Sequence, residues 1–317
     1  MEFNWLLENK GLLLNGLFGL EKENVRVTPT GKLALTPHPA CFGDKTANPF
    51  ITTDFSESQI EMITPPLPSI PAACDFIETL HDIVTESIGD ELLWPQSLPP
   101  TLPNSEEIPV AQYENADQEL EEYRHHIGRI YGKERQLISG IHFNVSFSEA
   151  FFDEAVKRAN GAHTRAEIKE LVYLKVMRNW MKHRWLYVWL FGETPIAKRG
   201  FQVQSLTTGE AQPMCCGASM SLRTSPLGYR NREAFFFDFS SLATYMSEVE
   251  ALVEAGKLVA TKELYLPIRI KCLPKDKGAP SYLEFRLIDL NPLEKNGIST
   301  HALYFVDRKS TRLNSSH

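Results

Sequence analysis

The sequence lacks the features that define several protein classes. Its 317 residues include only five cysteines, and their spacing matches neither a zinc site nor a disulfide framework, which fits a reducing, cytoplasmic setting. No run of about 18 apolar residues could span a membrane, and the N-terminal residues do not follow the order of a signal peptide. With 18 glycines and 20 prolines, the chain is not fibrous or of low complexity.

Basic residues are also too few for some functions. The chain has 33 Lys and Arg against 40 Asp and Glu, and the net charge of −7 argues against a nucleic-acid or anionic-membrane partner. It contains no Walker A loop, dinucleotide fingerprint or zinc-protease helix. If a nucleotide binds, metal ions and arginines must therefore hold its phosphates. What remains is an ordinary globular composition of one large domain or two small ones.

Helical periodicity covers four segments, at about residues 69–88, 117–131, 164–191 and 240–255. Thr164 and Glu167 form a capping box at the start of the third. The end of that helix, 185–191, is apolar on all sides, which predicts a central place in the core. Residues 92–109 are rich in proline and predict an extended surface connection, and 198–216 predict a mobile loop. The adjacent Cys215 and Cys216 in that loop are interpreted as ordinary thiols.

Other segments alternate apolar with polar residues at the period of a strand. They are residues 17–27, 59–63, 141–147, 218–223, 266–271 and 282–287. Together they predict an α+β fold, in which an antiparallel sheet packs on helices through one face and presents acids and bases on the other. Glu21 and Glu23 share an otherwise apolar face of the first strand, and Lys22 points the opposite way.

The charged face would mix both signs, with Glu21, Glu23, Glu61 and Glu284 beside Arg223, Arg269 and Arg286. Carboxylates buried together repel one another unless a cation compensates, and hard divalent metals prefer oxygen ligands. The alternative is that this face is wet and its glutamates are solvated. A face of both signs suits an anionic substrate bridged by metals, as in phosphoryl transfer. The pattern therefore indicates a metal-dependent ligase or phosphotransferase.

Collinear motifs from about Leu17 to Pro292 resemble a known family. They are Gly19–Val27, Ile51–Glu57 with Glu61–Pro65, Gly89–Glu91 with Trp94–Pro95, Ala111–Tyr113, Tyr123, Ile138–Asn144, Ser221–Arg223 with Leu227–Tyr229, Glu263–Arg269, and Tyr282–Arg286 with Asp289–Pro292. The set resembles bacterial glutamate–cysteine ligase (γ-glutamylcysteine synthetase). The residues of the later motifs are most similar to those of the N-terminal ligase part of bifunctional glutathione synthetases.

The resemblance implies a glutamine-synthetase-like fold, with an antiparallel sheet curved into a funnel and helices on its outer face. It also implies the first reaction of glutathione biosynthesis. ATP phosphorylates the side-chain carboxylate of glutamate, and the amine of cysteine then attacks the γ-glutamyl phosphate. Two alternatives stay open: another carboxylate–amine ligase of the same fold, and an inactive fragment that still binds magnesium and nucleotide.

The resemblance implies roles for individual residues. Two or three Mg²⁺ ions, or Mn²⁺ in their place, would lie between ATP and glutamate, held by Glu21, Glu23, Asp54, Glu61, Glu284 and His142. Histidine is a softer ligand than carboxylate, so His142 is either a ligand or phosphate contact or a structural residue. Arg286, Glu284 and His142 would be catalytic, with Arg286 on the ATP phosphates.

The resemblance also implies the substrate contacts. Arg223 would grip a carboxylate of glutamate with its guanidinium fork, and Gln136 and Ile138 would be its neighbours. Tyr123, Tyr229 and Tyr265 would bind cysteine, and the alternative for these tyrosines is core packing. The expected partners are thus the small molecules glutamate, cysteine and ATP.

The end of the chain changes character. Residues 308–317 hold few apolar side chains and resemble a cloning read-through tail, so residues 1–307 are interpreted as a ligase domain that is incomplete at its C-terminus. In the bifunctional relatives an ATP-grasp domain follows and adds glycine. This chain has no room for such a domain.

Overall fold

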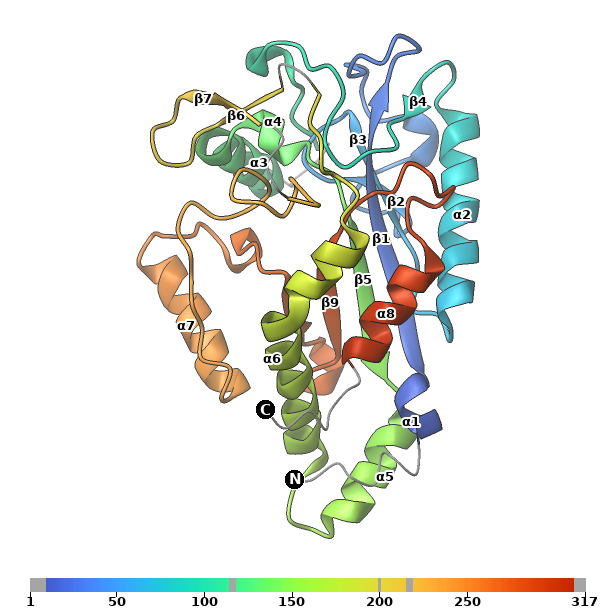
Figure 1. The fold of residues 1–317 in the computed structure, drawn as a ribbon, viewed down its shortest axis with the longest axis vertical. Helices are drawn as coiled ribbons and strands as arrows, with labels where there is room; N and C mark the ends of the chain where they lie inside the picture. The colour runs from blue at the N-terminus through green and yellow to red at the C-terminus, as the bar shows by residue number, and fades with distance from the viewer. Residues whose placement is uncertain (1–9, 114–117, 199–200, 215–218, 311–317) are drawn as a thin grey trace.

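The computed structural model describes residues 10–113, 118–198, 201–214 and 219–310. Its centre is an antiparallel sheet with the strand order β2-β3-β1-β5-β9-β8 (Figure 1). These strands are β1 (Gly16–Val27), β2 (Ile51–Thr53), β3 (Gln59–Ile63), β5 (Ile141–Phe147), β8 (Ile268–Lys271) and β9 (Tyr282–Ile288), and β4 (Leu92–Leu93) pairs with the end of β1. The α+β fold with an antiparallel sheet and packed helices is confirmed.

One face of the sheet is apolar because side chains alternate along each strand. On β1, Phe18 and Leu20 lie in register with Val145 and Phe143 of β5, and all four are buried in the main core cluster. Helices cover this face. The neighbouring Glu21 therefore points to the opposite face.

The face of β1 that carries Glu21 and Glu23 lies opposite the main core, and it also carries Val25 and Val27, which are buried, as the expectation of two acids on an otherwise apolar face requires. Leu17, at the start of that face, is exposed. Lys22 does point away from both acids, as the alternation predicts, and it is buried under the helices, where its Nζ lies 3.0 Å from Nδ1 of His81.

The helices that cover the apolar face are α2 (Ile70–Ser87), α5 (Glu149–Ala159), α6 (Arg165–Phe191) and α8 (Thr300–Ser310). The last of these lies between α6 and α2 (Figure 1). Ser69, Ser148 and Thr164 each cap a helix by accepting a hydrogen bond from a backbone N–H three residues on. The capping box of Thr164 and Glu167 is confirmed.

Smaller elements complete the chain. They are α1 (Lys10–Leu14), α3 (Gln118–Tyr131), α4 (Lys133–Gln136), α7 (Leu242–Glu254), the hairpin of β6 (Gln202–Gln204) and β7 (Ala211–Pro213), and the 3₁₀ turns Ala40–Phe42, Ser105–Glu107, Thr261–Glu263 and Pro274–Asp276. The four predicted helices correspond to α2, α3, α6 and α7, and Asp117 lies outside the described residues. No helix in the described parts of the chain is long and apolar enough to cross a membrane.

The C-terminal turns of α6 are not central in the core, contrary to the prediction for residues 185–191. Tyr187 is buried, but Trp185 is 62% exposed and Trp189 is 63% exposed. An apolar run without periodicity indicates that a helix can be buried on every side. Whether it is buried depends on the elements that pack around it. Here α8 covers one side, where Phe305 packs on Tyr187 and Phe191.

Two predictions about irregular segments also need correction. The predicted strand at 218–223 is a bend with an isolated bridge between Thr194 and Ser221, and Ala218 lies outside the described residues. The predicted loop at 198–216 contains the β6–β7 hairpin, and Cys215 and Cys216 lie outside the described residues.

The segment 92–109 is not wholly on the surface. Ser97 is buried, where its carbonyl accepts a hydrogen bond from the backbone of Ser139 and its hydroxyl accepts one from the backbone of Leu290. The proline-rich composition predicts an extended chain. It does not predict these hydrogen bonds, which hold part of the segment in the interior.

Candidate active site

Acidic side chains meet on the face of the sheet opposite α2, α5, α6 and α8. The register places Glu21 of β1 opposite His142 of β5, and Glu23 of β1 opposite Glu61 of β3. Residues opposite one another on antiparallel strands have side chains about 5 Å apart at their Cβ atoms. Asp54 joins them from the turn between β2 and β3.

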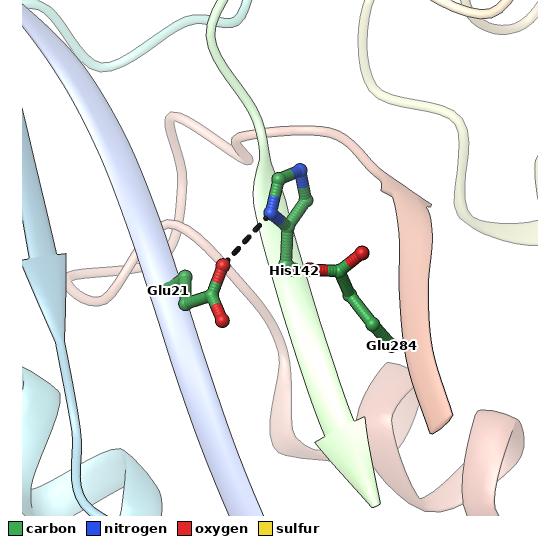
Figure 2. Close-up of side chains that lie close together, drawn as sticks. All are labelled: Glu21, His142 and Glu284. Atoms are coloured by element: carbon green, nitrogen blue, oxygen red, sulfur yellow. Dashed lines mark hydrogen bonds and ion pairs between the residues drawn. The ribbon is translucent and has the colours of Figure 1, made fainter. Parts of the chain in front are cut away.

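Glu284 arrives from β9, on the other side of β5. Figure 2 shows Glu21 and Glu284 on either side of His142. The Oε2 atom of Glu21 lies 3.1 Å from Nδ1 of His142, and Oε1 of Glu21 accepts a hydrogen bond of 2.7 Å from Asn144. One possible ligand atom from each of Glu21, His142 and Glu284 lies within 4.8 Å of the others. That spacing suits a shared cation.

The two glutamates of this group are held ionised. Burial opposes ionisation of Glu21, but hydrogen bonds from His142 and Asn144 outweigh it and hold its pKa below the usual value. Burial also opposes ionisation of Glu284, and here Arg286, His142 and Lys271 hold the pKa well below its ordinary range. Arg286 and Lys271 contact the two Glu284 oxygens at 3.0 and 3.1 Å.

The neighbouring acids Glu23 and Glu61 have pKa values that are raised, not lowered. Burial and the charge of Asp54 raise the pKa of Glu23 to about 8, and burial, Asp54 and Glu21 raise the pKa of Glu61 well above its usual value. The backbone N–H of Gly140 donates a 3.0 Å hydrogen bond to Glu23. Carboxylates in this arrangement repel one another, and a multivalent cation would relieve the repulsion.

A cavity of about 310 Å³ opens beside these acids. Its walls are Glu21, Glu23, Asp54, Phe55, Glu61, Leu120, Tyr123, Arg124, Ile127, Gln136, His142, Tyr229, Lys262, Tyr265 and Arg286. We call it the acidic pocket. It brings together the predicted metal residues other than Glu284, the three predicted tyrosines, Gln136 and Arg286.

The three tyrosines line the acidic pocket together with Gln136. The rings of Tyr229 and Tyr265 are 4.3 Å apart, and the hydroxyl of Tyr265 lies 3.4 Å from Oε1 of Gln136. The Nε2 atom of Gln136 is buried without a hydrogen-bond partner. Burial raises the pKa of Tyr123, so its hydroxyl is neutral and can donate a hydrogen bond.

Two cations of the acidic pocket were not predicted from the sequence. The Nζ of Lys262 lies 4.0 Å from the centre of the Tyr123 ring, and Arg124 donates a hydrogen bond to the backbone carbonyl of Asp54. Arg124 directly follows Tyr123, and Lys262 lies three residues before Tyr265. Their proximity to motif residues is the only signal in the sequence, and it does not separate them from surface cations.

Arg223 and Ile138 do not line the acidic pocket. Arg223 is buried behind it, where its Nη1 donates a 3.0 Å hydrogen bond to the carbonyl of Arg286. Its guanidinium lies against Gly140, at which a Cβ atom would be 2.1 Å from Nη2. Ile138 packs in a small apolar cluster with residues such as Leu222, and its backbone N–H donates to the carbonyl of Arg135.

A second cavity, of about 600 Å³, lies on the other side of Glu21 and Asn144. It is bounded by the N-terminal end of β1, the C-terminal end of β5 and the segment 273–282, and Lys275 and Tyr282 are among its walls. Glu21 lines both cavities. The group of Glu21, His142 and Glu284 therefore lies close to both cavities.

The family model described as glutamate-cysteine ligase matches residues 3–259. The chain belongs to the glutamate–cysteine ligase family. It is 46% identical over 307 residues to the glutathione biosynthesis bifunctional protein of Listeria monocytogenes serotype 4b (strain F2365), a match that covers 93% of this chain and 40% of that protein. The corresponding protein of Desulfotalea psychrophila is 44% identical over 291 residues, which are 90% of this chain and 37% of that one.

Two solved structures of the family have a similar fold. The bifunctional glutathione synthetase of Pasteurella multocida superposes with a TM-score of 0.83 at 34% identity, over 97% of this chain and 40% of that one. The glutamate–cysteine ligase of Francisella tularensis, solved in complex with AMP, gives a TM-score of 0.81 at 25% identity, over 96% of this chain and 67% of that one. This chain thus spans about 40% of the length of the curated bifunctional relatives that it matches.

Proposed function

We propose that this chain carries an ATP-dependent ligase site, which joins the γ-carboxylate of glutamate to the amine of cysteine through γ-glutamyl phosphate. The observation that carries the proposal is the acidic group of Glu21, His142 and Glu284, which lies close to both cavities and next to Arg286. A phosphoryl transfer needs its donor and acceptor on either side of such a charged group. Family membership supports the same reaction.

The two cavities suit different substrates. The larger one, of about 600 Å³, has room for a nucleotide, and the Francisella relative was solved with AMP. The acidic pocket, of about 310 Å³, suits two small amino acids. Its tyrosine hydroxyls and the cations Arg124 and Lys262 are donors for the carboxylate of the amine acceptor.

The donor set fits divalent magnesium. Glu21, Glu23, Asp54, Glu61 and Glu284 supply oxygen ligands, and the raised pKa values of Glu23 and Glu61 indicate repulsion that a cation would remove. His142 lies 3.1 Å from Glu21, and burial and then Arg286 lower its pKa, which favours the neutral ring that can act as a ligand. When bound, magnesium supplies charge neutralisation of the phosphate oxygens.

The protein's own side chains would bind the substrates and exclude water. Arg286 lies beside Glu284 in the wall of the acidic pocket, where it can hold phosphate oxygens. Arg223 can bind a carboxylate, and the closely packed rings of Tyr229 and Tyr265 limit the access of water to an acyl phosphate. Exclusion of water matters because hydrolysis competes with attack by the amine.

The test measures ADP release in the presence of Mg²⁺, ATP and glutamate, while cysteine, 2-aminobutyrate and other amines are varied. We expect cysteine to stimulate turnover most strongly. Stimulation by a different amine would favour another carboxylate–amine ligase of the same fold. Binding of Mg²⁺ and ATP without turnover on any amine would show that this chain is not itself a ligase.

A second proposal concerns the extent of the parent protein. Because the bifunctional relatives are much longer than the part matched here, we propose that the parent continues past residue 307 into the rest of the ligase and an ATP-grasp domain that adds glycine. Sequencing of the source DNA beyond the codon for Asp307 tests this. A stop codon directly after that position would contradict it.

A further inference from the structure

Tyr265 of the acidic pocket lies in an irregular segment, between the 3₁₀ turn Thr261–Glu263 and the start of β8. Chain outside helices and sheets must satisfy its backbone hydrogen-bonding groups by other means. Asn231, two residues after Tyr229, does so here with both ends of its amide. Its Oδ1 accepts a 2.8 Å hydrogen bond from the backbone N–H of Tyr265, and its Nδ2 donates a 2.8 Å bond to the carbonyl of Glu263. One side chain therefore joins the segments that carry Tyr229 and Tyr265.

The same amide also reaches α3. The Nδ2 of Asn231 donates a 3.1 Å hydrogen bond to the hydroxyl of Tyr131, and that hydroxyl donates a 2.6 Å bond to Oε1 of Glu263. The ring of Tyr131 packs edge-on against that of Tyr265, with centroids 5.4 Å apart. Tyr131 is the last residue of α3, and Tyr123 lies about two turns earlier on the same helix. The network therefore connects all three segments that bring tyrosines to the acidic pocket.

The three residues of this network, Tyr131, Asn231 and Glu263, are buried. Their exposed fractions are 2%, 6% and 1%. The described walls of the acidic pocket do not include them, so they can affect a ligand only through the side chains that do line it. A buried amide that has partners at both ends resists displacement, because movement would leave buried polar groups without hydrogen bonds.

Displacement of the segment would move two walls of the acidic pocket together. Lys262 directly precedes Glu263, and its Nζ lies 4.0 Å from the centre of the Tyr123 ring. Tyr265 follows Glu263 by two residues. Because Asn231 holds the carbonyl of Glu263 and the N–H of Tyr265, it fixes the backbone between these two pocket residues. The positions of the Lys262 ammonium and the Tyr265 hydroxyl therefore depend on one buried amide.

We propose that Asn231 is a positioning residue for the amine acceptor, because its amide holds Tyr265 and Lys262 where they can meet the acceptor's carboxylate. The inference rests on the proposed function, in which these side chains are donors to that carboxylate. The described walls of the larger cavity, which suits the nucleotide, include no residue of the network. Loss of the network should therefore weaken binding of the acceptor and leave binding of the nucleotide unchanged.

The experiment titrates the full chain with L-cysteine by isothermal titration calorimetry, in the presence of Mg²⁺ and a non-hydrolysable ATP analogue and without glutamate. It compares wild type with Asn231→Ser, whose side chain is too short to bridge the two backbone groups. We expect the Kd for cysteine to rise about tenfold, while the Kd for the ATP analogue stays within about twofold. Neither readout requires turnover.

Asn48→Ser is the matched control. The amide of Asn48 also bridges backbone groups, because its Nδ2 donates to the carbonyl of Phe42 at 2.8 Å and its Oδ1 accepts from the N–H of Ile51 at 3.0 Å. Asn48 lies outside the described walls of the acidic pocket. Both serine variants should lose thermal stability, but Asn48→Ser should bind cysteine as tightly as wild type. Equal cysteine affinity in the two variants would show that Asn231 has only a structural role, and would overturn the proposal.

Two further measurements complete the test. Amide hydrogen exchange at Tyr265, measured without ligand, reports the hydrogen bond to Asn231 and should accelerate in Asn231→Ser but not in the control. Tyr131→Phe keeps both backbone bonds of Asn231 and should weaken cysteine binding by only about threefold. If Asn231→Ser does not fold, an unchanged cysteine affinity in Tyr131→Phe overturns the proposal. Failure of wild type to bind cysteine would instead overturn the proposed function, and the acceptor role of Asn231 with it.

Discussion

The acidic pocket shares a wall with a smaller cavity of about 150 Å³, here called the arginine pocket because Arg184, Arg223, Arg230 and Arg286 line it, and the two carry opposite charge. Tyr229, Tyr265 and Arg286 belong to both. On one side, Glu23 and Glu61 have raised pKa values because acids crowd together. On the other, Arg184, Arg223 and Arg230 have no carboxylate in contact among the residues that the structure describes. Each side therefore carries an excess of one charge, negative in the acidic pocket and positive in the arginine pocket, that an ion of the opposite charge would compensate.

The two pockets are also built in different ways. The acids on β1, β3 and β9 have their places fixed by strand register. Three of the four arginines come from a helix and an irregular segment. Strand register determines which face of the sheet each side chain occupies, because a shift of one residue would turn every acid to the other face. The arginine pocket depends instead on how α6 and the segment near Ser221 pack on the sheet.

The largest effect on stability and turnover is expected from substitution of Glu284, an acid of the proposed metal site that pairs with Arg286 of both pockets. This residue is buried and paired with both Arg286 and Lys271. Glu284→Gln removes the negative charge and leaves those cations uncompensated, so the free energy of unfolding should fall by about 3–5 kcal/mol. Loss of the carboxylate should also abolish turnover. Urea unfolding at neutral pH and the ADP-release assay measure the two effects.

The control for this variant is Glu149→Gln. Glu149 forms ion pairs with Arg165 and Lys169 but is largely exposed, so it should lose less than about 1 kcal/mol. Equal losses in the two variants would show that Glu284 does not compensate buried charge. Unchanged turnover in Glu284→Gln would remove it from the proposed metal site.

A smaller effect is expected at Asp289, which lies behind Arg223. Its Oδ2 accepts a 2.7 Å hydrogen bond from Thr194 and its Oδ1 a 3.0 Å bond from Ser221. Asp289→Asn places an NH₂ group against one of these donors, at a cost of about 1–3 kcal/mol in the free energy of unfolding. The KM for glutamate should rise more than kcat falls, because the bend that holds Arg223 is disturbed. Asp238→Asn, at an exposed site, is the control.

The acidic pocket also predicts how stability depends on pH. Folded Glu23 has a pKa of about 8 and folded Glu61 a raised one, whereas the usual value is 4.5. Between these values the folded state holds more protons than the unfolded state, so stability without metal should fall as pH rises from about 5 to 8. Bound Mg²⁺ would replace those protons, and its stabilising effect should therefore grow over the same range.

Thermal unfolding at about pH 6 and about pH 8, with Mg²⁺ and with a chelator, measures this dependence; we expect the effect of Mg²⁺ to differ by a few degrees. Glu61→Gln should reduce the difference, because it removes one of the two shifted groups. A stabilisation by Mg²⁺ that is constant with pH would contradict the assignment of Glu23 and Glu61 as coupled metal-binding carboxylates.

The sequence predicts the sheet and its acids well, because alternation is a local property. Strands β1, β3, β5, β8 and β9 and the meeting of Glu21, His142 and Glu284 follow from period two once the strands pair. The sequence does not predict where a segment lies when contacts distant in sequence decide it. Residues 185–191 were expected in the core, yet Trp185 and Trp189 are exposed.

The arginines illustrate the same limit within the site. Arg286 shares a strand face with Glu284, so its place could be predicted. Arg223 was assigned to a strand face that does not exist, because the chain bends at Ser221. Arg184 and Arg230 carry no signal in the sequence, since a single arginine on a helix or in an irregular segment is usually solvated. Their common pocket is evident only when the packing of α6 is known.

The smallest effect on stability is expected from substitution of Lys22, which lies on the face of β1 opposite Glu21 and Glu23. This buried lysine lies between Glu21 and Glu23 in sequence but points under the helices, where the neutral ring of His81 is its hydrogen-bond partner. Burial lowers its pKa to about 7, so at neutral pH the folded state holds a half-charged group that has no acidic partner in the described parts of the chain. Lys22→Met keeps the volume and removes that charge, and should stabilise the fold by about 1 kcal/mol. Urea unfolding measures the change, and a loss of stability would mean that Lys22 compensates the acids through the strand after all.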